Sequence, residues 1–137
     1  MSTQAVRQFG SRQSFQLPAS PAADRPIDLV HLSRQTLGDR ELEIELLSLF
    51  ERQAAQVMER LLQPNGNGER RWRHDLAHTL KGSARAIGAG RVAACAQVFE
   101  EALFSAATDA EIAAILAELG QAVEESRVAA LDFLSEG

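Results

Sequence analysis

Apolar residues recur at spacings of three and four along most of the chain, which is the period of an amphipathic α-helix. The clearest example runs from Asp39, a residue type suited to cap a helix N-terminus, to about Gln63. No segment shows the strict alternation of apolar and polar residues that is typical of a half-buried strand. The apolar face predicted for this helix consists of Leu42, Leu46, Leu49, Phe50, Val57 and Leu61.

Glycine, proline and asparagine divide the helical pattern into five segments. A short helix is expected from Asp28 to about Thr36, where Gly38 is suited to a left-handed helix end. The run Pro-Asn-Gly-Asn-Gly at 64–68 precedes a third helix over about 69–87. After a break at 88–90, two more helices are expected over about 91–105 and 109–134. The fourth is expected to bury Val92, Cys95, Phe99 and Leu103, and the fifth Ile112, Ile115, Leu116, Leu119, Val123, Ala130 and Phe133.

Four long amphipathic helices joined by short turns predict an all-α fold. We expect an antiparallel, up-and-down four-helix bundle over residues 27–137, with the short first helix as an N-terminal cap. Enough helices are present to close one core, so a monomer is expected. Residues 1–26 show no helical period and no apolar block, and they predict a flexible N-terminal tail.

The net charge of −5 is distributed unevenly along the chain. Residues 69–91 contain six bases and two acids, a local charge of +4, whereas the remainder carries −9. A mainly acidic chain with one basic segment is poorly suited to bind nucleic acid in general, and it fits one acidic partner surface better. No apolar run reaches the 18 residues of a membrane span, and Cys95, the single cysteine, cannot form an internal disulfide.

The third predicted helix concentrates the candidate chemistry on one exposed face. At about 100° per residue, His78 lies roughly 160–200° from Leu76 and Leu80, so it is expected to point to solvent. Gly82, one turn later, costs helix stability and leaves a gap beside the imidazole. The predicted core stripe comprises Trp72, Leu76, Leu80, Ser83 and Ile87, and the residues that share the face of His78 are His74, Lys81, Gly82 and Arg85.

An exposed imidazole with cations nearby is suited to phosphoryl transfer. Neutral imidazole is a competent nucleophile near pH 7, and its phosphorylated form is a reactive donor. Because charge spreads over the equatorial oxygens of the transferring group, nearby cations such as Lys81 are expected to stabilise it.

The run from His78 to Ala84 reads His-Thr-Leu-Lys-Gly-Ser-Ala and is followed by Gly88. It resembles the signature of histidine-containing phosphotransfer (HPt) domains, Ala-His-x-Leu-Lys-Gly-(Ser)-(Ala) with a later glycine. The layout of the chain is similar to that family over about residues 26–134.

The resemblance implies a concrete function. His78 would be phosphorylated on its outer ring nitrogen and would exchange phosphoryl with an aspartate of a receiver domain. Lys81 would support the phosphoryl group, and Gly82 would keep the approach open. The implied partners are the receiver of a response regulator and a hybrid histidine kinase, in the cytoplasm, with Mg²⁺ held by the receiver and no cofactor in this chain. No nucleotide-binding glycine loop is present, so we expect a carrier and not an ATP-using enzyme.

Two alternatives remain open from the sequence. His74 and His78, at i and i+4, could hold zinc, but no third ligand is evident; His31 is remote in sequence and is expected to fix or border the first helix. A non-catalytic adaptor could dock a receiver through the same basic face. In either the carrier or the adaptor, His74 and Arg85 are expected to contribute to docking.

Overall fold

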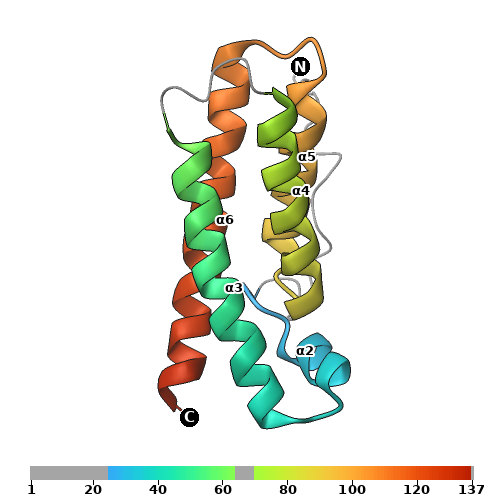
Figure 1. Cartoon of the computed structure of the whole chain (residues 1–137), viewed down its shortest axis with the longest axis vertical. Helices are drawn as coiled ribbons and strands as arrows, with labels where there is room; N and C mark the ends of the chain where they lie inside the picture. Colours follow the sequence, from blue (N-terminus) through green and yellow to red (C-terminus); the bar gives the residue numbers. More distant parts are fainter. Residues whose placement is uncertain (1–24, 64–69, 137) are drawn as a thin grey trace, which may run out of the picture.

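The computed structural model describes residues 25–63 and 70–136, which form five helices and, within those ranges, no strand. Figure 1 shows four long helices side by side, with the short α2 beside one end of them. The predicted all-α class is confirmed. The predicted break at 64–68 and the predicted tail, apart from Arg25 and Pro26, lie outside the described residues. The helices are α2 (Leu29–Thr36), α3 (Arg40–Leu61), α4 (Arg70–Ile87), α5 (Gly90–Leu103) and α6 (Asp109–Glu136).

Aspartate caps begin the first two helices, as the sequence predicts. The Asp28 carboxylate accepts hydrogen bonds from the backbone N–H groups of Val30 and His31, each at 3.1 Å. The Asp39 carboxylate accepts from the backbone N–H of Leu42 at 3.2 Å. These bonds satisfy amide donors that have no partner within the helix.

The left-handed end of α2 begins one residue earlier than predicted. Leu37 has φ 54°, and Gly38 follows with φ 79°. A left-handed conformation is costly for leucine, so Gly38 and the capping bonds of Asp39 fix a turn that Leu37 alone would disfavour.

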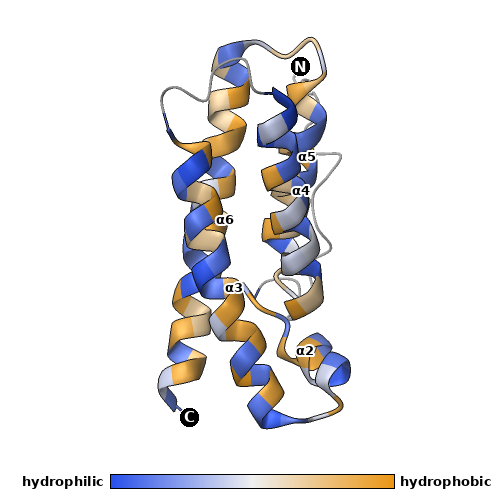
Figure 2. Cartoon of the chain, in the orientation of Figure 1, coloured by the Kyte–Doolittle hydropathy of each residue, from blue (hydrophilic) through white to orange (hydrophobic). Residues whose placement is uncertain are grey.

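The core lies between the four long helices. α3 packs against α4 and α6, and α5 packs against the same two helices, so that the contacts form a closed ring. Figure 2 shows apolar residues concentrated on the inward faces and polar residues outside. The largest fully buried side chains include Leu47, Phe50, Leu80, Phe99 and Leu119, with at least one from each long helix.

The buried faces differ in detail from the predicted ones. On α3, Leu42 and Leu49 are 36% and 52% exposed, whereas Leu47 is fully buried. Leu42 and Leu49 lie roughly 80–100° around the helix from Phe50, beyond the strip that the neighbouring helices cover. On α4 the core strip is turned toward α5. Ala77 and Ala84 are buried there. Residues predicted as buried that are only half-buried are Leu46, Trp72, Leu76, Ser83, Cys95, Ile115 and Phe133.

Gly88 lies in the predicted break directly after α4, where it contacts the N-terminus of α2. Its φ is +84°, and a Cβ there would lie 2.8 Å from the carbonyl oxygen of Asp28. The Asp28 N–H donates to the Gly88 carbonyl at 2.9 Å. Next to this contact, His31 Nε2–H donates to the Arg85 carbonyl at 2.8 Å. The prediction that His31 fixes the first helix is therefore confirmed.

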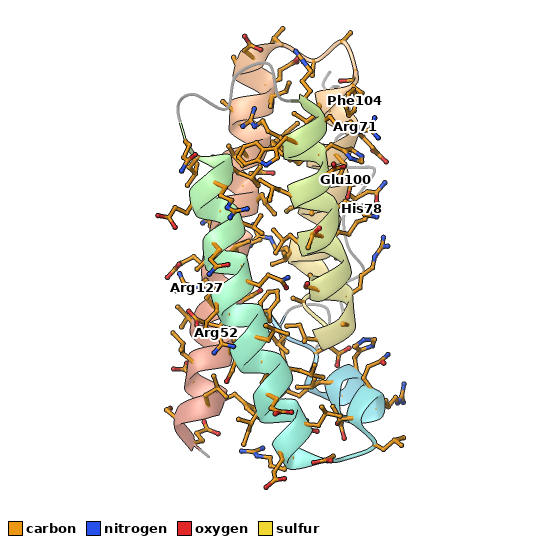
Figure 3. All side chains as sticks on the ribbon, viewed as in Figure 1. Arg52, Arg71, His78, Glu100, Phe104 and Arg127 are labelled. Carbon is orange, nitrogen blue, oxygen red and sulfur yellow. The ribbon has the colours of Figure 1, made fainter. Side chains whose placement is uncertain are left out.

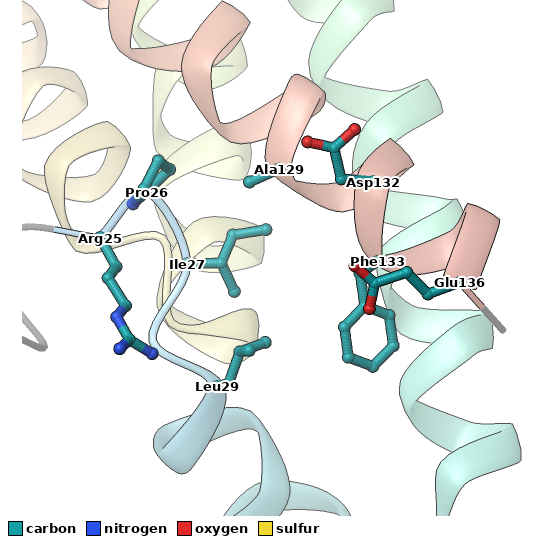
Figure 4. Close-up of a pocket in the computed structure, with 8 residues that line it drawn as sticks. All are labelled: Arg25, Pro26, Ile27, Leu29, Ala129, Asp132, Phe133 and Glu136. Carbon is teal, nitrogen blue, oxygen red and sulfur yellow. The ribbon is translucent and has the colours of Figure 1, made fainter.

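A pocket of about 250 Å³ lies between residues 25–29 and the last turns of α6 (Figure 4). Ile27, Leu29 and Phe133 give it apolar walls, and no residue of the predicted site lines it. None of the helices in the described ranges is long and apolar enough to cross a membrane.

Candidate functional site

His78 lies midway along α4 with its side chain 65% exposed, as the helical angles predict. Leu80, two residues later, is fully buried and fixes the rotation of the helix. Because two residues correspond to roughly 200° of turn, burial of Leu80 points His78 outward. Figure 3 shows His78 on the same edge of the bundle as Glu100 of α5.

Open space lies next to His78. Gly82, one turn later, is exposed, and a Cβ there would meet no atom within 4 Å among the described residues other than its chain neighbours and the backbone of its own helix. Gly82 is therefore not a point at which a neighbouring helix packs closely against α4.

Lys81 does not lie on the exposed face, and this part of the prediction is wrong. Its side chain is only 9% exposed, because α5 covers that flank of α4. The ammonium donates to Gln97 Oε1 at 2.8 Å and to Glu100 Oε1 at 3.2 Å. The site therefore presents an exposed imidazole with its nearest ammonium bound inside the helix interface.

Glu100 is the functional candidate that the sequence analysis missed. Its side chain is 8% exposed and pairs with Lys81, whose Nζ lies 3.0 Å from Oε2. That contact does not have hydrogen-bond geometry, and Oε2 is a buried oxygen with no hydrogen-bond donor among the described residues. The other oxygen, Oε1, lies 3.4 Å from His78 Nδ1. The sequence does contain a signal for Glu100. It is a charged residue in the buried strip of α5, between Ala96 and Leu103.

His74 reaches the same carboxylate. Its Nε2 lies 3.5 Å from Glu100 Oε1, and its Nδ1 lies 3.4 Å from Asp75 Oδ1. The His74 and His78 rings are parallel to within 9°, with centroids 6.0 Å apart. The exposed Phe104, another residue that the sequence analysis did not single out, packs edge-on against His74 at 5.5 Å.

Most of the local positive charge is already bound within the fold. Arg70 donates to the Leu103 carbonyl, and Arg73 donates to the Leu61 carbonyl at 3.3 Å. Arg91 pairs with Glu125 on α6 at 2.5 Å.

Two exposed arginines, Arg71 and Arg85, form no ion pair with any residue that the structure describes. They lie seven residues before and after His78, which places them on its face at roughly 10 Å along the helix axis in each direction.

The arrangement suits nucleophilic chemistry at the outer nitrogen of His78. A carboxylate next to Nδ1 favours the tautomer that carries its proton there, and Nε2 then keeps a free lone pair. The zinc alternative gains no third ligand, since residues 25–63 and 70–136 contain no group of three or more His, Cys, Asp or Glu side chains arranged to hold a metal.

Comparison with known families agrees with this geometry. The family model described as the Hpt domain matches residues 45–129, which include all of α4 and α5. Searches of curated proteins and of solved structures returned no match. Hpt domains act as phosphocarrier modules in histidine phosphotransfer and have no ATP site of their own. On the extent of this match, the chain belongs to the Hpt domain family.

Proposed function

We propose that this chain relays a phosphoryl group between a receiver-domain aspartate and Nε2 of His78 in a two-component phosphorelay. The observation that carries the proposal is the exposed His78 ring, which has a buried carboxylate 3.4 Å from Nδ1 and open space over the next helical turn. An ordinary surface histidine requires neither of these features.

In the forward step, the lone pair on Nε2 attacks the phosphorus of the receiver's aspartyl phosphate. The N–P bond forms as the P–O bond to the aspartate breaks, and the aspartate leaves as a carboxylate. The proton on Nδ1 stays in place, so the phosphorylated ring acquires positive charge that Glu100 stabilises from 3.4 Å. Transfer to the next receiver reverses these changes.

We assign Lys81 two roles. In the resting structure it compensates the buried charge of Glu100, since Nζ lies within 3.2 Å of both carboxylate oxygens. During transfer, rotation about its flexible stem would bring the ammonium toward the phosphoryl oxygens, where charge accumulates.

Docking follows from the outer face of α4. Gly82 would admit the receiver to His78, and His74, Arg85 and the newly identified Arg71 would border the approach. Two arginines on either side of the imidazole are complementary to an acidic, Mg²⁺-binding receiver pocket. A hybrid histidine kinase is the expected upstream source of phosphoryl groups.

The finer topology is part of the proposal. We infer an antiparallel, up-and-down four-helix arrangement, which is supported by the closed ring of helix contacts and by the alternating direction of the colours along α3 to α6 in Figure 1. This arrangement turns the face of α4 that carries His78 away from the core.

The test is incubation of the purified chain with a phosphorylated receiver that carries radiolabelled phosphate. We expect acid-labile label to move to this chain and to be lost completely in His78→Gln. His74→Gln is the matched control, because it removes an imidazole from the same face and should still accept label. Label on His78→Gln would overturn the assignment, and binding without any transfer would favour the adaptor function.

A further inference from the structure

Three side-chain nitrogens lie close to a single oxygen of Glu100. Oε1 forms hydrogen bonds with Lys81 Nζ at 3.2 Å and with His78 Nδ1 at 3.4 Å. His74 Nε2 lies 3.5 Å from the same oxygen, within ion-pair distance but without hydrogen-bond geometry in this arrangement. The two imidazoles approach it from successive turns of α4, so they compete for the same acceptor.

His74 also has a second acceptor within reach. Its Nδ1 lies 3.4 Å from Asp75 Oδ1, on the opposite side of the ring from Glu100. A neutral imidazole carries one N–H, which is on Nδ1 or on Nε2. In the Nε2–H form, His74 would donate to Glu100 in competition with His78. In the Nδ1–H form, His74 would donate to Asp75, and Glu100 would then accept from His78 without this competitor.

Two neighbouring rings keep His74 in reach of both carboxylates, so its tautomer determines which of them accepts its proton. Phe104 packs edge-on against it at 5.5 Å, and the His78 ring lies parallel to it. Its side chain is 33% exposed, about half the value for His78. Its ion-pair partners within the described residues are Asp75 of α4 and Glu100 of α5.

We propose that His74 is a positioning residue whose tautomer decides whether Glu100 holds the Nδ1 proton of His78. Asp75 biases His74 toward the form that releases Glu100. The role of His78 as phosphoryl acceptor rests on the proposed function, whereas the coupling between the two rings does not.

Nitrogen-15 NMR of histidine-labelled protein tests the coupling directly. Long-range ¹H–¹⁵N correlations report which ring nitrogen carries the proton, and spectra would be recorded where the ¹⁵N shifts show both rings to be neutral. Removing the competitor with His74→Phe should raise the ratio of Nδ1–H to Nε2–H on His78 by roughly twofold or more, because hydrogen bonds to charged acceptors shift such equilibria by at least this factor.

Asp75→Ala should lower the same ratio, since His74 then has only Glu100 as acceptor. Asp75→Asn keeps an accepting oxygen and should recover part of the loss. Opposite shifts in His74→Phe and Asp75→Ala support the proposal. An unchanged ratio in both, with chemical shifts elsewhere preserved, would overturn it.

Transfer kinetics give a second readout. The first-order rate at saturating phosphorylated receiver should rise in His74→Phe and fall in Asp75→Ala in proportion to the fraction of His78 in the Nδ1–H form. If His74 served docking alone, KM for the receiver would rise in His74→Phe and the tautomer ratio would not move. If the proposed function fails, no variant transfers phosphoryl, yet the NMR ratios still report whether the rings are coupled.

Discussion

Two of the ion pairs that connect neighbouring helices in this bundle are built differently. Lys81 and Glu100 join α4 to α5 next to the imidazoles, and Arg127 and Glu51 join α6 to α3. Figure 3 shows Glu100 and Arg127 on different edges of the bundle. Both bring opposite charges from different helices together in partly or fully buried positions.

The α6–α3 pair leaves no buried side-chain nitrogen or oxygen without a hydrogen-bond partner among the described residues. Arg127 donates to Glu51 Oε2 from Nε at 3.1 Å and from Nη2 at 2.6 Å, and its Nη1 donates to Glu124 at 3.2 Å. The hydrogen bond to Glu51 raises the pKa of the Arg127 guanidinium above its usual value. These residues have no evident task beyond joining the helices.

The α4–α5 pair has a carboxylate whose hydrogen-bonding capacity is not fully used. Glu100 Oε2 accepts no hydrogen bond in the described structure, and Oε1 is shared among Lys81, His78 and His74. Buried polar atoms are nearly always satisfied in proteins, so an exception calls for an explanation. Glu100 therefore contacts the neighbouring imidazoles as well as joining the two helices, whereas Glu51 only joins its helices.

The largest effect is expected from removing the cation at the α4–α5 edge. Lys81→Ala leaves Glu100 buried without its main counter-charge and should lower the free energy of unfolding by about 3 kcal/mol, measured by urea denaturation. Transfer from a phosphorylated receiver should slow by about tenfold or more, because a stabilising cation is lost. The double variant Lys81→Met, Glu100→Leu removes both charges and should recover most of the stability without recovering transfer. A stability loss below that of Arg127→Ala would show that the α4–α5 pair depends on its cation no more than the α6–α3 pair does.

The corresponding change at the other edge should be milder. Arg127→Ala breaks a pair that water partly reaches, and it should cost about 1 kcal/mol of unfolding free energy. Its rate of phosphoryl acceptance should equal that of the unchanged chain once both are compared well below their melting temperatures. Slower transfer in this variant would show that the two edges are not separate in function.

The smallest effect concerns the open space beside His78. Gly82→Ala should raise the free energy of unfolding by about 0.5–1 kcal/mol, because helical glycine is entropically costly and a Cβ there meets nothing. Gly82→Leu should fold equally well but slow transfer, since the longer side chain obstructs the receiver. Gly88→Ala is the contrasting control and should destabilise the chain, because φ is +84° and the Cβ meets Asp28. Unaltered transfer in Gly82→Leu would mean that the gap is irrelevant.

The local structure and the exposure of the central histidine could be predicted from the sequence. The caps at Asp28 and Asp39 depend on side chains that bond their own backbone, and the break at Gly88 depends on a conformation that glycine adopts without strain. His78 is exposed because it lies opposite Leu80 on the helix, and a residue opposite a buried one has no neighbour to cover it.

The exposure of residues on the flanks of each helix could not be predicted from the sequence, because it depends on where the neighbouring helices pack. Lys81 lies about 100° from Leu80, an angle at which a side chain is exposed or buried according to the position of the adjacent helix. For the same reason the sequence did not predict that Leu49 is exposed and Leu47 is buried on α3. Glu100 became part of the site because α5 brings it to His78 from 22 residues away in sequence. The helical period fixes the angle of a side chain about its helix axis, but the packing of the helices decides whether that side chain meets a neighbour or solvent.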